Sequence, residues 1–114
     1  MNTNDLAREL YEKAVINVVS TILTDLSSCS NTGTLSDFYM KLSDGDKVFL
    51  KVFIEMVAFN VVSQFTCILD NRAVGDFEDD FILTDKKSSE KLNNFELQDD
   101  FINMCKFEWN LYDT

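Results

Sequence analysis

The chain has 114 residues, 46% of them apolar, and its twenty acidic residues outnumber ten basic ones, which gives a net charge of −10. This length is typical of one domain with one core, so we expect a single domain over residues 1–114. The negative charge makes nucleic-acid backbones and anionic membranes poor partners and a basic protein surface a better one. Acidity that serves solubility alone is the alternative explanation.

The cysteines and the N-terminal sequence bear on the cellular compartment. Cys29, Cys67 and Cys105 form an odd, widely spaced set that fits neither a disulfide framework nor a zinc site. The N-terminus has no basic region followed by an apolar stretch, so no secretory signal is predicted. The most apolar segment, residues 56–69, is too short to span a membrane. We therefore expect a cytoplasmic protein with reduced thiols and no membrane contact.

The first predicted element is an amphipathic helix over residues 5–26. Asn4 is a suitable N-cap, and the polar, glycine-containing run at 27–33 is a helix stop. Apolar residues that recur every four positions indicate the helix: Leu6, Leu10, Ala14, Val18, Ile22 and Leu26.

Two capping-box patterns predict the next two helices. The first pattern, residues 34–37, predicts a short helix over 35–42, and the second, residues 43–46, opens a long helix over 46–69. In the long helix only a stripe that begins with Lys47, Lys51 and Glu55 is polar. Because apolar residues occupy nearly every other face, we expect this helix to be central and buried.

The C-terminal third is predicted to contain one more helix. The short apolar segment near residues 81–84 is compatible with a small β element. Residues 86–94 are mostly polar, which is typical of a loop. Apolar residues from Leu97 to Tyr112 then follow helical spacing. The predicted fold is mainly α: a compact bundle of three to four helices with a long central helix.

Most enzyme signatures are missing from the sequence. Without histidine, a Ser-His or Cys-His nucleophile pair cannot form, and three glycines supply no phosphate-binding loop. Carboxylate-only catalysis is formally open, although the acidic residues do not lie beside apolar pockets in the sequence. We expect a protein that is not an enzyme and needs no cofactor or metal.

One acidic cluster is a candidate binding site for a basic partner. Its carboxylates could take Arg or Lys side chains while an aromatic ring fills an apolar pocket. A solvated acidic turn with the ring in the core is the alternative, and the cluster does not match a calcium loop. The cluster consists of Asp76, Phe77, Glu78, Asp79 and Asp80.

A second group of candidate residues lies further along the chain. Glu96, Asp99 and Asp100 fall in the first turn of the last predicted helix, where acids stabilise the helix dipole and can also contact a partner. Trp109 and Tyr112 are suited to anchor an interface, and core packing explains them equally well.

Three segments of the second half resemble small acidic immunity proteins that neutralise bacterial polymorphic or contact-dependent toxins. The resemblance implies a cytoplasmic, non-enzymatic inhibitor that occludes the active site of a toxin, often a basic nuclease. The segments are Ile68-Leu69-Asp70-Asn71, Gly75-Asp76-Phe77-Glu78-Asp79-Asp80-Phe81 and Leu97-Gln98-Asp99-Asp100-Phe101.

The sequence thus leads to a ranked set of binding functions. An immunity-type inhibitor of a basic toxin comes first, with the acidic C-terminal half as its docking surface. An acidic mimic of nucleic acid, which would antagonise a DNA- or RNA-binding enzyme, comes second. A helical adaptor or oligomerisation module comes third, and it predicts self-association through apolar surface with little salt dependence.

Overall fold

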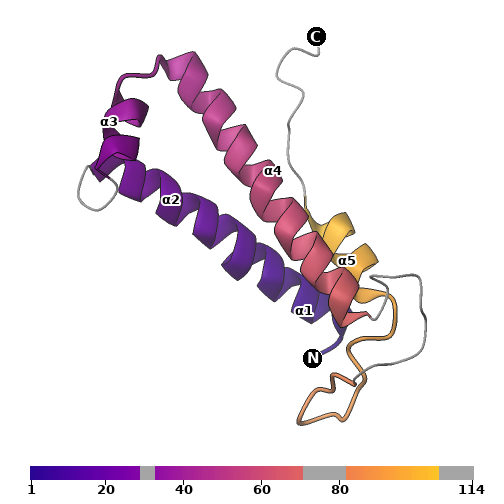
Figure 1. Ribbon diagram of the computed structural model, residues 1–114. Helices are drawn as coiled ribbons and strands as arrows, with labels where there is room; N and C mark the ends of the chain where they lie inside the picture. Colours follow the sequence, from indigo (N-terminus) through magenta and orange to yellow (C-terminus); the bar gives the residue numbers. More distant parts are fainter. Residues whose placement is uncertain (29–32, 71–81, 106–114) are drawn as a thin grey trace.

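The computed structural model describes residues 1–28, 33–70 and 82–105, and the fold is mainly α, as predicted (Figure 1). A long first helix and the longer helix α4 converge at one end of the molecule, where α5 also lies. The elements are α1 (Thr3–Glu9), the π-helical segment η1 (Leu10–Ile16), α2 (Asn17–Ser28), α3 (Thr34–Met40), α4 (Asp44–Leu69) and α5 (Leu97–Met104).

The first helix begins two residues earlier than predicted. Asn2, rather than Asn4, is the N-cap: its side chain accepts a hydrogen bond from the backbone N–H of Asp5 at 2.9 Å. The Asp5 carboxylate in turn accepts the N–H of Asn2 at 3.0 Å. This reciprocal pair is a capping box, which satisfies two backbone donors that the helix itself leaves unbonded.

The segments α1, η1 and α2 follow one another without interruption. Within η1 the hydrogen bonds span five residues, as in the bond from the N–H of Asn17 to the carbonyl of Glu12. The apolar side chains that recur every four residues lie in two environments. Leu6 and Leu10 pack against the core, whereas Val18 and Ile22 are exposed.

We call the region where α1, η1, α5 and the C-terminal part of α4 meet the packed end. Phe101 of α5 is fully buried there and stacks on Phe59 of α4, with ring centroids 5.8 Å apart. The buried core residues of this end are Ala7, Val15, Val62, Leu97 and Phe101.

Polar contacts fix the start of α5 against the end of α4. The carboxylate of Asp70, which is fully buried, accepts the backbone N–H of Gln98 at 2.9 Å. The side-chain amide of Gln98 donates to the carbonyl of Ser63 at 3.2 Å. These bonds satisfy buried backbone groups and hold the two helices in register.

At the opposite end, which we call the splayed end, α2 and α4 diverge and α3 joins them (Figure 1). Gly33, with a positive φ of 49°, is the N-cap of α3, so the predicted cap at Thr34 is not used. Ser43 caps α4 as its sequence pattern predicted, since its hydroxyl accepts the N–H of Asp46 at 3.1 Å.

The prediction that the long helix is buried is wrong for most of its length. Only three of its residues, Val62, Ser63 and Thr66, are buried, and they lie in its C-terminal third. The radius of gyration is 17.3 Å, against about 13 Å for a globular domain of this size, so the arrangement is less compact than we expected. Over the described residues, the diverging helices leave most of α4 without a second layer.

The β element near residues 81–84 is reduced to one isolated antiparallel bridge, between Thr84 and Lys91. The N–H of Leu92 donates to the carbonyl of Leu83 at 2.7 Å beside this bridge. Phe81 lies outside the described residues. In the turn between the bridged residues, the backbone N–H and the hydroxyl of Ser88 bond the Asp85 carboxylate and lower its pKa. No strand forms in the described part of this segment.

Candidate interaction surface

The predicted acidic site is only partly visible in the structure. Glu96, Asp99 and Asp100 lie together at the start of α5, as expected, and Glu96 and Asp99 are exposed. Seven further predicted site residues fall outside the described ranges: Asp76, Phe77, Glu78, Asp79, Asp80, Trp109 and Tyr112.

Asp100 has a structural contact that the sequence did not indicate. Its carboxylate accepts a hydrogen bond from the hydroxyl of Thr3 at 2.6 Å, and Thr3 itself is buried. This short, charge-assisted bond ties α1 to α5 across 97 residues of sequence. Asp100 therefore belongs to the packed end and is half-buried, whereas Glu96 and Asp99 are exposed.

An apolar groove with a volume of about 540 Å³ lies between α2 and α4. Its α2 wall has apolar side chains four residues apart, and its α4 wall is equally apolar. The lining residues are Ala14, Val18, Ile22, Phe53, Ile54, Val57, Ala58, Val61 and Val62. No charged side chain lines the groove, so it cannot bind a partner through ion pairs.

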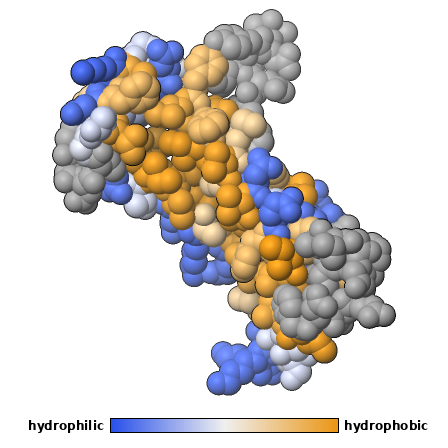
Figure 2. All heavy atoms as spheres, viewed as in Figure 1, coloured by the Kyte–Doolittle hydropathy of each residue, from blue (hydrophilic) through white to orange (hydrophobic). Residues whose placement is uncertain are grey.

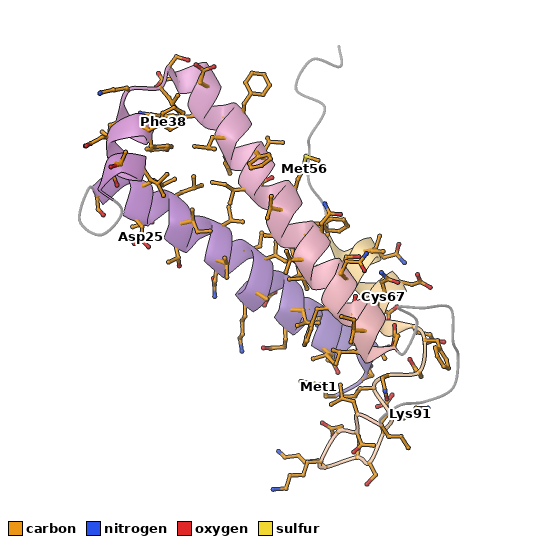
Figure 3. All side chains as sticks on the ribbon, in the orientation of Figure 1. Met1, Asp25, Phe38, Met56, Cys67 and Lys91 are labelled. Atoms are coloured by element: carbon orange, nitrogen blue, oxygen red, sulfur yellow. The ribbon has the colours of Figure 1, made fainter. Side chains whose placement is uncertain are left out.

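The groove opens onto a wider apolar surface. In Figure 2 the hydrophobic residues form a continuous area over α4 and the space between it and α2. Phe53 and Val61 are 62% and 63% exposed, which is far more than a core residue. Side chains of α2 and α4 point toward one another across this space, and Phe38 lies at its far end (Figure 3). Met56 extends the apolar surface to the side of α4 away from α2.

A second groove lies on the other side of the α2–α4 pair and has a different chemistry. Its volume is about 640 Å³, and its walls combine Ile16, Val19 and Leu23 with serine and threonine hydroxyls and with the Lys51–Glu55 pair. The two charged groups lie 3.9 Å apart. The Lys51 side chain is 57% exposed and the Glu55 side chain 13% exposed, so of the polar stripe expected from the sequence only the lysine of this pair is well solvated.

By length and composition α4 could cross a membrane. It has 26 residues, and an 18-residue window reaches a mean hydropathy of 1.8 with 17% of its residues buried. The charge-free segment 56–69, on which the length argument against a span depended, is only part of this helix. That length argument therefore does not apply to α4 as a whole, and the absence of membrane contact stays a prediction.

The thiols and acids show no arrangement suited to metal chemistry within the described ranges. Cys67 and Cys105 are free and half-buried, and burial raises the pKa of the Cys105 thiol to about 11. A thiol with such a pKa is protonated at neutral pH and reacts slowly. Across residues 1–28, 33–70 and 82–105, no three His, Cys, Asp or Glu side chains gather where they could hold a metal ion.

The groove was missed because the sequence pattern of α4 is ambiguous. A helix that is apolar on almost every face is usually buried, and nothing in its own sequence says that neighbouring helices will diverge. The signal that could have found it is the second half of the four-residue stripe in α2, which continues past the region that α5 can cover. No family model, no curated protein and no solved structure matches this chain.

Proposed function

We propose that this chain is a non-enzymatic protein-binding module that receives an apolar partner surface in the groove between α2 and α4. The groove itself carries this proposal: two helices hold their apolar side chains apart and open to solvent. Monomeric proteins rarely expose continuous apolar patches of more than roughly 300 to 600 Å² unless the patch binds something. An apolar helix laid between two helices is the mode of recognition that suits such walls.

The packed end argues for a protein partner over a lipid one. The C-terminal part of α4, from Ala58 on, is held by the stacking of Phe59 on Phe101 and by the hydrogen bonds of Gln98. Thr66 and the C-cap Asp70 in this part are polar and buried. Insertion of the whole helix into a bilayer would break these contacts. The remainder of the helix, residues 44–57, is shorter than the roughly 20 residues that a spanning helix needs. A net charge of −10 further disfavours anionic lipid surfaces.

Inhibition of a toxin is the narrower form of this proposal. Its support is the resemblance of the second half to immunity proteins and the net negative charge. In that form the acidic residues, among them Glu96 and Asp99, would meet a basic toxin surface. The apolar groove adds a second contact region that charge alone does not provide.

Partner capture with matched variants distinguishes the two surfaces. The full chain is immobilised as wild type, as Val57→Glu in the groove, and as the double variant Glu96→Lys and Asp99→Lys on α5. We expect Val57→Glu to lose the captured partner and the double variant to retain it. The amount of partner captured by the wild type should change little between low and high salt. Loss in the α5 variant alone, with steep salt dependence, would assign binding to the acidic surface and overturn the groove proposal.

A further inference from the structure

We infer that the groove between α2 and α4 is filled by a second copy of this chain, in a two-fold dimer joined at the splayed ends. This inference names the partner in the proposed function and depends on it. In the dimer, the α4 helix of each copy lies in the groove of the other. The result is a four-helix arrangement of two α2 and two α4 helices.

The size of the exposed apolar surface matches such a dimer. Aromatic side chains present roughly 150 to 250 Å² each, and ten apolar side chains between residues 18 and 61, apart from Met56 on the far side of α4, are between 38% and 63% exposed. Together they expose on the order of 800 Å², the area that one partner contributes to a stable interface. They are Val18, Ile22, Leu35, Phe38, Met40, Val48, Phe49, Phe53, Val57 and Val61.

The same surface contains both halves of a self-complementary contact. A two-fold interface requires one patch to supply the ridge and the hollow, because each copy presents the same residues. The ridge here is the exposed face of α4 that carries Phe53, Val57 and Val61. The hollow is the space between this helix and the side chains of Val18 and Ile22 on α2. Val57 lies midway along the α4 wall, so the two-fold axis passes near it.

The distribution of charge favours this end for contact between like-charged copies. Residues 17–62 contain five acids and three lysines, a net charge of −2 out of −10 for the chain. Most of the charge that would repel a second copy therefore lies in other parts of the sequence. The only charged residues on the α4 segment from Val48 to Val62 are Lys51 and Glu55, which line the opposite groove.

The test is the molar mass of the full chain in solution, measured by light scattering and sedimentation over a range of concentrations. We expect a dimer for the wild type and a monomer for Val57→Glu. Two unpaired carboxylates buried near the axis raise the dimer dissociation constant on the order of 100-fold. Ile102→Glu places the same charge on a side chain of α5 that is 41% exposed, against 48% for Val57, and is expected to remain dimeric.

A mixing experiment separates a lost interface from a lost fold. Val57→Glu and Val57→Lys are each expected to be monomeric, and an equimolar mixture is expected to recover the dimer mass because opposite charges then meet at the axis. A wild-type monomer at every concentration, or a mixture that stays monomeric, overturns the inference. In that case partner capture that still depends on Val57 would leave the proposed function intact and assign the groove to a different protein.

Discussion

At its C-terminal end α4 packs against η1 and α5, whereas its N-terminal half, which is equally apolar, faces solvent. Phe59 stacks on a buried ring, and Phe53, six residues earlier on the same helix, is 62% exposed. The difference comes from the neighbours: α5 covers only the C-terminal part of α4, and α2 diverges from the rest. An apolar helix is therefore buried only where other elements pack alongside it. We expect most of the free energy of unfolding to come from the packed end.

The largest expected effect comes from paired phenylalanine substitutions at the two ends. Phe101→Ala leaves a cavity in the core and is expected to lower the free energy of unfolding by about 3 to 5 kcal/mol. Phe53→Ala removes a side chain that is mostly in solvent and should cost less than about 1 kcal/mol in the monomer. Denaturant unfolding at low protein concentration measures both. Equal losses would mean that the two ends are equally packed.

A smaller effect is expected from the polar contacts that hold α5. Asp70→Ala removes the acceptor of the Gln98 N–H and should lower the free energy of unfolding by about 1 to 3 kcal/mol. Asp70→Asn keeps an acceptor oxygen and is the matched control, with a smaller loss. Chemical denaturation compares the two variants. If Asp70→Ala unfolds at the wild-type denaturant concentration, this bond does not hold α5.

The N-cap of α1 lies at the packed end and the N-cap of α4 at the splayed end, so the same kind of substitution can compare the stability of the two ends. Asn2→Ala at the packed end and Ser43→Ala at the splayed end each remove one cap, which costs about 1 kcal/mol in a helix that unfolds with the rest of the protein. We expect the full loss for Asn2→Ala. For Ser43→Ala, amide hydrogen exchange should show local fraying of α4 with little change in global stability. An equal global loss for both would show that the splayed end unfolds cooperatively with the core.

The smallest effect concerns Cys105 at the edge of the packed end. Its folded pKa of about 11 lies above the ordinary value of 9.0, so the unfolded chain releases this proton first as the pH rises. The contribution to stability is complete below pH 9 and is lost as the pH approaches 11. In a variant with Cys29→Ser and Cys67→Ser, alkylation should reach half its maximal rate near pH 11, and near pH 9 after unfolding in urea. A half-point near pH 9 in the folded protein would contradict burial of this thiol.

Local signals in the sequence were sufficient for the elements but not for their arrangement. The cap at Ser43, the C-terminal end of α4 and the start of α5 follow from side-chain patterns within a few residues, whereas α4 begins two residues before the predicted start at 46. The position of Asn2 as the cap, two residues before the expected one, depends on a reciprocal bond with Asp5 that Asn4 cannot form at that spacing. The predicted β element did not form a strand in the described residues, because the one bridge between Thr84 and Lys91 is not extended by further pairs.

The candidate site was harder to predict because its chemistry depends on long-range placement. Asp100 is one of several similar acids in the sequence, and only the approach of Thr3 makes it a structural residue. The groove likewise needs α2 and α4 to diverge, and no local pattern encodes the angle between them. Sequence reasoning therefore favoured charge as the binding determinant, whereas the described residues make apolar surface the larger feature.

The bond between Thr3 and Asp100 joins residues from nearly opposite ends of the chain and has a consequence for protein synthesis. Phe101 completes the core, so the packed end cannot close until α5 has left the ribosome. Until then the nascent chain exposes both halves of α4, including the part that α5 later covers. Contacts of such high sequence separation slow folding and prolong the exposure of apolar segments. Early chaperone binding to α4 is therefore expected during translation of this protein.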